Sequence, residues 1–258
     1  FKGDDTPVVN LVIVGGGATG VELSAELLNV ASSLHHYGLT DFDENQIQLT
    51  LLEAGNRLLP ALPEKLSIAA IEELTSIGVD VRLNTAVSEV NSNQILTENG
   101  EKIKSDITVW AAGVRGAKYL TDLDGLATDR LDRLIVNKHL QTTYDPNVFA
   151  MGDCASFTPP GSIRPLPPRA QAAHQMAINV FENIISLSEN RSLKPFIYND
   201  RGSLVSLSRF STVGSLMGNL IGGRLAIEGR LARIAYMSLY RLHLFAIHGW
   251  LRGIILIL

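Results

Sequence analysis

The stretch LVIVGGGATGVELSAE, residues 11–26, constrains the fold more than any other part of the chain. A run of apolar β-formers breaks into three consecutive glycines and continues in a helical pattern. This order predicts a strand over residues 10–14, a tight turn, and a helix that starts near Ala18. The three pieces form a β-turn-α unit, the local structure from which parallel α/β sheets are built.

The glycines of this turn have the spacing G-x-G-x-x-G at Gly15, Gly17 and Gly20. In a dinucleotide-binding unit the first glycine turns the chain, the second lets the backbone approach a pyrophosphate, and the third lets the helix pack on the strand. The dipole and free N–H groups at the start of the helix attract the diphosphate. A purely structural glycine turn is the alternative, but strand, glycines and helix in register favour dinucleotide binding.

The next apolar strand, Ile47–Leu52, ends directly before an acidic residue, Glu53. At this position an acid accepts hydrogen bonds from the ribose hydroxyls of an adenosine. The interval from Gly20 to Glu53 is longer than the usual ~20 residues, because a long helix and a polar loop lie between them. A carboxylate repels a 2′-phosphate, so the sequence predicts NADH rather than NADPH.

The rest of the first 113 residues continues an α/β pattern. Asn99-Gly100, between two short β-patterned segments, is a strong signal for a hairpin turn. The sequence therefore predicts a parallel α/β core with one β-hairpin insertion. The predicted elements are a helix over residues 64–77 and strands over residues 79–83, 86–90, 94–97, 102–103 and 106–112.

Two features near the glycine turn and in the middle of the chain have open interpretations. Glu22 either compensates the dipole of the first helix or places a carboxylate near the nicotinamide end of a bound dinucleotide. The apolar segment 147–150 predicts a short strand that leads into Gly152 and Asp153. This Gly-Asp pair either offers a carboxylate to a polyol hydroxyl or forms an ordinary turn.

A proline-rich segment precedes a predicted helix over residues 169–187. Gln171 and Gln175 are separated by four residues, so both amides project from one side of the helix. His174 has no second His or Cys at ligand spacing, and we predict no metal site. The single cysteine, Cys154, excludes an intrachain disulfide and a redox cysteine pair.

The last segment, residues 201–258, differs from the acidic body because it holds seven Arg and one acid. Strand-like pieces at residues 203–207 and 225–227 precede a long pattern over residues 229–258, in which four Arg residues are interleaved with aliphatic and aromatic residues. This pattern favours an amphipathic helix that lies on lipid over one that binds nucleic acid, and it lacks the ~20 uncharged apolar residues of a membrane span. Burial against a partner subunit is the alternative.

Five motifs in this order resemble those of type II NADH dehydrogenases, single-subunit, non-proton-pumping NADH:quinone oxidoreductases that contain FAD. The motifs are VGGGATGVELSAE, LLEAG, WAAGV, VFAMGDCA and PPRAQAAHQMA, followed by the basic tail. The resemblance implies a two-dinucleotide-binding-domain flavoprotein with three parts. These are an NADH-binding domain (residues 1–113), the C-terminal part of an FAD-binding domain (114–200) and a membrane-anchoring region (201–258).

The resemblance also implies a role for each matching residue. Glu22, Gln171 and Gln175 would act beside the flavin and the quinone. The residues implied to bind NADH or FAD are Gly15, Gly17, Thr19, Gly20, Glu53, Ala112, Gly113, Gly152 and Asp153.

The implied reaction is hydride transfer from NADH to FAD and transfer of two electrons to a membrane quinone, without proton pumping. The protein is expected to be peripheral on the cytoplasmic face of the bacterial inner membrane, bound through its C-terminal helix, and a homodimer is an open expectation. Because the family's own FAD glycine motif lies upstream of the first residue, the sequence is expected to be a fragment. Two alternatives are a soluble ferredoxin- or disulfide-type flavoprotein reductase and a membrane-attached NADH-binding module without turnover.

Overall fold

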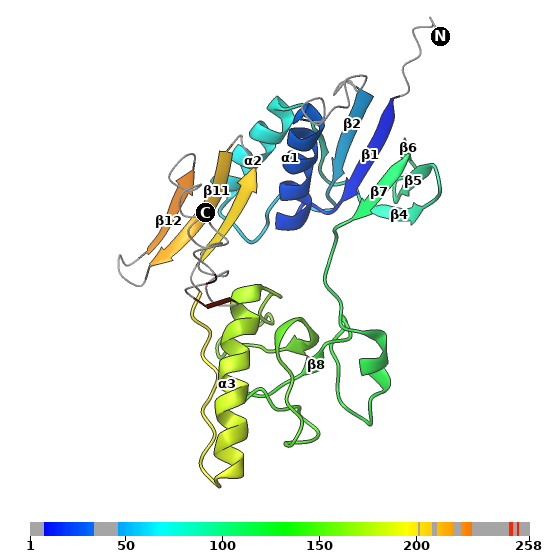
Figure 1. Ribbon diagram of the computed structural model, residues 1–258. Helices are drawn as coiled ribbons and strands as arrows, with labels where there is room; N and C mark the ends of the chain where they lie inside the picture. Colours follow the sequence, from blue (N-terminus) through cyan, green and yellow to red (C-terminus); the bar gives the residue numbers. More distant parts are fainter. Residues whose placement is uncertain are drawn as a thin grey trace, which may run out of the picture. The chain divides into compact units, whose positions relative to one another are not determined.

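The computed structural model describes residues 8–33, 46–200, 202–207, 211–218, 223–228, 248–249 and 252. The chain divides into two compact units. The first contains Phe1–Ala112 and Gly202–Leu258, and the second contains Gly113–Arg201. Figure 1 shows the elements of each unit.

A four-stranded parallel sheet of order β3-β2-β1-β7 forms the centre of the first unit. β1 (Val9–Val14) and β2 (Ile47–Leu52) form the middle, while β3 (Asp80–Arg82) and β7 (Ile107–Trp110) form the edges. Alternate side chains of a strand point to opposite faces of the sheet. The side chains on the two faces of this sheet belong to two separate buried clusters, and a different layer covers each face.

One face of the sheet carries α1 (Ala18–Ser33) and α2 (Glu64–Ser76). Their apolar residues share one buried cluster with the odd-numbered residues of β1 and β2. The other face carries an antiparallel sheet of β4 (Val87–Val90), β5 (Gln94–Thr97) and β6 (Lys102–Lys104). Gly100, with φ +86°, turns the chain between β5 and β6, which confirms the predicted hairpin.

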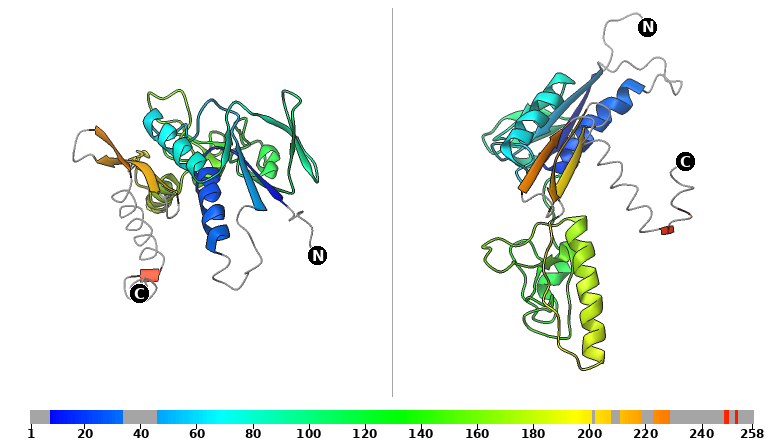
Figure 2. Two further views of the ribbon diagram at one scale, coloured as in Figure 1. Left: turned by 90° about the horizontal axis from the view of Figure 1, so that it is seen from above. Right: turned by 90° about the vertical axis from the view of Figure 1, so that its left-hand side faces the viewer.

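A second antiparallel sheet of the first unit follows residue 201. It consists of β10 (Gly202–Leu207), β11 (Ser211–Gly218) and β12 (Gly223–Glu228). Val205 and Leu207 of β10 are buried in the cluster that α1 and α2 share with the sheet. Figures 1 and 2 show these strands in yellow to orange, with β10 and β11 beside the two helices. The sequence predicted β10 and β12 but not β11.

The second unit has one long helix and little sheet. α3 (Ala170–Ser188) packs through Met176 and Val180 on a cluster that includes Phe157 and Phe196, whose rings meet edge to face at 5.1 Å. The remaining elements are η3 (Lys118–Asp122), β8 (Leu134–Ile135), η4 (Gly152–Cys154) and β9 (Ala155–Ser156).

The predicted strand over residues 147–150 is wrong. Only Phe149 forms a bridge in this segment, antiparallel to Gln141, and it stands outside every named strand. The backbone bonds of Thr142 to Val148 (2.8 Å) and of Ala150 to Leu140 (3.0 Å) tie the segment to one neighbour. A strand needs a ladder of such pairs, and apolar composition alone does not supply the partner.

Candidate dinucleotide and acceptor sites

The glycine turn lies between β1 and α1, as the sequence predicts. Gly15 has φ +117°, and its N–H donates to the Leu52 carbonyl at 2.8 Å. A Cβ on Gly15 would lie 2.8 Å from Ala112 Cα, and a Cβ on Gly20 would lie 1.9 Å from the Gly15 carbonyl oxygen. Real Cβ atoms do not approach backbone this closely, so both positions require glycine for the fold itself.

Gly17 differs from the other two motif glycines because a Cβ there would meet no atom within 4 Å. Its carbonyl accepts the N–H of Val21 at 3.1 Å, so α1 starts directly after it. The first N–H groups of a helix have no partner within the helix, and they face the end where Ala18 and Thr19 are exposed. Open space beside these donors is what a pyrophosphate needs.

The Glu53 side chain lies at the mouth of this turn. Its Oε2 accepts the Gly16 N–H at 2.6 Å, and its Oε1 accepts the Gly55 N–H at 2.7 Å. The Glu53 backbone N–H donates to the Arg82 carbonyl at 2.9 Å, which fixes the residue to the end of β3. The expected juxtaposition of glycine turn and acid is therefore present, whereas the two amide bonds to the carboxylate had no signal in the sequence.

Glu22 is the fifth residue of α1 and is partly buried. The first turn of α1 contains no acidic residue. The dipole effect is concentrated in that first turn, so the helix-dipole interpretation of Glu22 loses its physical basis.

The chain crosses from the first unit to the second at Ala112 and Gly113. Ala112 lies against Gly15, and its carbonyl accepts the Trp110 indole N–H at 2.9 Å. Gly113 has φ +78°, where a Cβ would meet nothing within 4 Å. The indole bond was not predicted, because a side chain reaching a carbonyl two residues ahead leaves no periodic pattern.

In the second unit, Gly152 and Asp153 form the start of the short 3-10 turn η4 rather than the end of a strand. Gly152 has φ +69°, and its N–H donates to the thioether sulfur of Met176 on α3 at 3.3 Å. Asp153 is exposed. An exposed carboxylate beside a tight glycine turn suits a polyol chain, and the same geometry also serves as a simple turn.

The carboxamides of Gln171 and Gln175 reach two consecutive residues, which agrees with the predicted projection of both amides from one side of the helix. Gln175 donates to the Asn199 carbonyl and accepts the Asn199 N–H, both at 2.9 Å. Gln171 donates to Asp200 Oδ1 at 3.4 Å, and the same oxygen lies 3.7 Å from Arg169. Both glutamines therefore hold the extended segment that runs back along α3, a role the sequence did not reveal.

Replacing Gln175 by alanine is expected to lower the free energy of unfolding by about 1 kcal/mol, because two hydrogen bonds are lost. Exchange of the Asn199 amide hydrogen should accelerate. His174→Ala, on the exposed side of the same turn, is the control and should change stability by less than about 0.5 kcal/mol. Unchanged protection of Asn199 in Gln175→Ala would show that the bond pair does not hold the segment.

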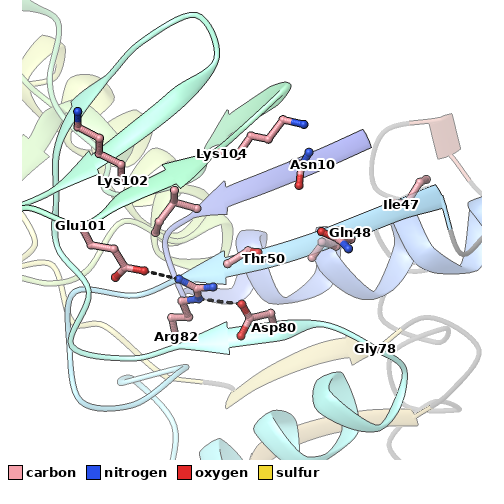
Figure 3. A pocket seen from close by; sticks show the side chains of 12 residues that line it. Asn10, Ile47, Gln48, Thr50, Gly78, Asp80, Arg82, Glu101, Lys102 and Lys104 are labelled. Carbon is pink, nitrogen blue, oxygen red and sulfur yellow. Dashed lines mark hydrogen bonds and ion pairs between the residues drawn. The ribbon is translucent and has the colours of Figure 1, made fainter. Parts of the chain in front are cut away.

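Two cavities among the described residues are lined by side chains other than those of the glycine turn. One, of about 420 Å³, is lined by Asn10 of β1, by the first four residues of β2, by Asp80 and Arg82 of β3 and by β6 (Figure 3). Arg82 crosses it between Asp80 and Glu101, with contacts of 2.7 and 2.8 Å. Ligands of parallel α/β sheets bind at the carboxyl ends of the strands, so this cavity is not the expected nucleotide site. A second cavity, of about 1100 Å³, belongs to the second unit.

Neither a metal cluster nor a membrane-spanning helix occurs in the part of the chain that the structure describes. The amphipathic helix expected over residues 229–258 falls almost wholly outside the described residues. Of that segment the structure describes only His248, Gly249 and Arg252, which are helical.

Comparison with known proteins agrees with this geometry. Residues 1–177 match the model of the pyridine nucleotide-disulphide oxidoreductase family. A type II NADH:quinone oxidoreductase of Haemophilus influenzae is 49% identical over 254 residues, which cover 98% of this chain and 57% of that protein. One from Staphylococcus aureus is 34% identical, over 87% of this chain and 56% of that protein. The chain thus spans a little over half the length of these relatives.

A solved structure with the same fold is that of NDH2 from Plasmodium falciparum in complex with NADH. It has a TM-score of 0.75 and 19% identity, and the match covers 91% of this chain and 62% of that chain. The glycine turn, the acid at the end of the second strand and these matches lead to one conclusion: the chain belongs to the pyridine nucleotide-disulphide oxidoreductase family, with type II NADH:quinone oxidoreductases among its relatives.

Proposed function

We propose that the protein transfers electrons from NADH to a quinone through FAD, without pumping protons. The observation that carries this proposal is the Glu53 carboxylate at the mouth of an open glycine turn, in a chain 49% identical to a type II NADH:quinone oxidoreductase. Because the chain spans 57% of that relative, the complete reaction is proposed for the full-length protein.

The first unit would hold NADH. The open space at Gly17 and the N–H groups at the start of α1, where Thr19 lies and where a helix offers no intrahelical acceptor, suit the pyrophosphate, while Gly15 and Gly20 keep the turn tight. A carboxylate has about four acceptor positions, and two of those on Glu53 are taken by amides. The remaining two suit the adenosine ribose hydroxyls. Ala112, which packs on Gly15, would border the nicotinamide side of the site.

The second unit would contribute part of an FAD site. The tight turn at Gly152 and the exposed carboxylate of Asp153 fit a ribityl hydroxyl, and Gly113 gives the chain room as it enters this unit. When bound, FAD would supply the two-electron chemistry that links NADH oxidation to quinone reduction.

Glu22, Gln171 and Gln175 are proposed to serve the acceptor side of the reaction. Glu22 is a partly buried carboxylate beyond the first turn of α1, where it can hold or move a proton. Gln171 would orient the quinone through its amide. Since Gln175 holds both backbone groups of Asn199, we assign it the task of fixing the segment that borders the site.

The protein is further proposed to lie on the cytoplasmic face of the bacterial inner membrane and to bind lipid through the basic amphipathic tail. Arg residues interleaved with aliphatic and aromatic residues over 229–258 support lipid binding rather than nucleic-acid binding. Homodimer formation is part of the same proposal. Lipid binding is tested by sedimentation with anionic vesicles. The protein is expected to sediment with the vesicles, and a variant without residues 229–258 is expected not to.

The central test is Glu53→Gln. Discrimination against NADPH, measured as the ratio of kcat/KM for the two nucleotides with a soluble quinone, is expected to fall about 100-fold because the charge that repels the 2′-phosphate is lost. Glutamine also places an NH₂ group against one of two backbone N–H donors, which costs about 1 to 2 kcal/mol of stability. Glu72→Gln, an exposed change of equal charge on α2, should alter neither quantity. Unchanged discrimination in Glu53→Gln would refute the ribose contact.

The purified wild-type protein also distinguishes the proposed enzyme from the alternative, a membrane-attached NADH-binding module without turnover. Such a module would bind NADH without flavin absorbance and without quinone reduction. The proposed enzyme would be yellow and would oxidise NADH when quinone is added.

A further inference from the structure

The Glu53 carboxylate is held at both oxygens by backbone amides of two separate segments. Oε2 accepts the Gly16 N–H of the glycine turn at 2.6 Å. Oε1 accepts the Gly55 N–H of the loop after β2 at 2.7 Å. Hydrogen bonds to a carboxylate are charge-assisted and stronger than neutral ones. The side chain therefore connects turn and loop and has a defined orientation before any ligand binds.

The loop that supplies Gly55 is itself fixed to the glycine turn. The Leu59 N–H donates to the Gly16 carbonyl at 2.8 Å, and Leu58 and Leu59 are buried in the core cluster. Ser67 on α2 donates to the Leu58 carbonyl at 2.6 Å. The Gly55 amide thus belongs to an anchored loop. If the Glu53 carboxylate rotated, the loop would stay in place and the hydrogen bond to Gly55 would break.

We propose that Gly55 is a specificity-determining positioning residue: its amide, with that of Gly16, locks the Glu53 carboxylate so that the nucleotide site rejects a 2′-phosphate. This inference rests on the proposed use of NADH. An unrestrained glutamate can rotate away from a 2′-phosphate at the cost of one rotamer change. The locked carboxylate can rotate only by breaking two charge-assisted bonds. It therefore stays beside a bound 2′-phosphate and repels it.

Gly55 is a better position for testing the lock than Gly16. A Cβ on Gly16 would lie 2.5 Å from Leu58 Cδ2 and 2.9 Å from Glu53 Cβ, so any substitution there disturbs the core. A Cβ on Gly55 would lie 3.0 Å from Glu53 Oε1, a contact that a shift of a few tenths of an ångström relieves without breaking either amide bond, and otherwise meets no atom closer than 3.9 Å. Gly55→Ala therefore keeps the amide at small steric cost, whereas Gly55→Pro removes it.

The experiment measures the Kd of NADH and of NADPH for the full chain by titration calorimetry, in wild type, Gly55→Pro and Gly55→Ala. We expect the preference for NADH to fall about tenfold in Gly55→Pro and to stay within about threefold of wild type in Gly55→Ala. A second variant, Glu53→Asp, keeps the charge but is one methylene too short to reach both amides. Its preference should fall as in Gly55→Pro.

The outcomes separate the two hypotheses. A wild-type NADH preference in both Gly55→Pro and Glu53→Asp overturns the lock while leaving NADH use intact. If Gly55→Pro does not fold, as judged by circular dichroism, Glu53→Asp decides alone. Failure of the wild-type chain to bind either dinucleotide overturns the proposed nucleotide site, and the lock with it.

Discussion

Gly17→Ala is expected to lower NADH affinity about 100-fold, or roughly 3 kcal/mol, while the free energy of unfolding stays within about 0.5 kcal/mol of wild type. A Cβ at this position meets no protein atom within 4 Å, so the fold tolerates it. The methyl group instead fills the space through which a pyrophosphate would approach the start of α1. Calorimetric titration with NADH and urea unfolding measure the two quantities separately.

Gly20→Ala is the matched comparison, because the same added methyl group has the opposite effect. Its Cβ would lie 1.9 Å from the Gly15 carbonyl oxygen, which forces α1 away from β1. We expect a loss of more than about 3 kcal/mol of stability, seen as a lower urea midpoint or as insoluble protein. If Gly17→Ala bound NADH as tightly as wild type, the pyrophosphate would not lie at the start of α1.

Asp129→Asn is expected to remove about 3 kcal/mol from the stability of the second unit. Asp129 accepts two bonds from the Arg133 guanidinium, at 2.7 and 2.9 Å, and backbone N–H bonds from Leu131 and Arg133. The Arg133 side chain is only 5% exposed, so the change leaves a buried cation without its counter-ion. Asparagine also presents an NH₂ group to a site built from donors. Urea unfolding followed by circular dichroism gives the loss.

A control for Asp129→Asn lies three residues away. Asp132 pairs with Arg115 at 2.6 Å, but the Arg115 side chain is 67% exposed, and such pairs contribute less than about 1 kcal/mol. Asp132 has φ +58°, a conformation that asparagine adopts readily. Asp132→Asn should therefore be nearly neutral. Equal destabilisation by the two changes would show that burial of the Asp129–Arg133 ion pair does not cause the larger loss of stability expected for Asp129→Asn.

The same ion pair predicts a pH dependence. Burial by itself would raise the pKa of Asp129, but hydrogen bonds from Arg133, Ser156 and Leu131 outweigh it and lower the pKa to about 2. Because this pKa lies below its value in the unfolded chain, the carboxylate stabilises the fold above about pH 4, and this contribution disappears as the pH falls toward 2. The expected loss is about 2 kcal/mol, and Asp129→Asn should not show it.

Local patterns predicted the central part of the nucleotide unit well. β2 has the predicted bounds, α1 starts at Ala18, near which the helix was predicted to start, and the Asn99-Gly100 hairpin is present. Each of these depends on a few consecutive residues whose backbone preferences agree with the fold. The position of Glu53 followed as well, because carboxyl ends of neighbouring parallel strands meet at one edge of the sheet.

Patterns failed where a segment depends on a distant partner. β11, STVGSLMG, has few strong β-formers, yet it pairs on both sides with β10 and β12. The segment 147–150 is apolar but has one bridged neighbour and forms no strand. Strand formation is decided by cross-strand pairing, which one segment of sequence does not contain.

The sequence by itself determined a turn of three spaced glycines, a helix after it and an acid at the end of the next strand. Only the tertiary structure decided which glycine is open to a ligand, that the Gly16 amide binds the Glu53 carboxylate, and that Gln175 binds the backbone of Asn199. The division has a physical cause. Backbone conformation follows from neighbouring residues, whereas hydrogen bonds between residues 24 or 37 positions apart exist only after the chain has folded.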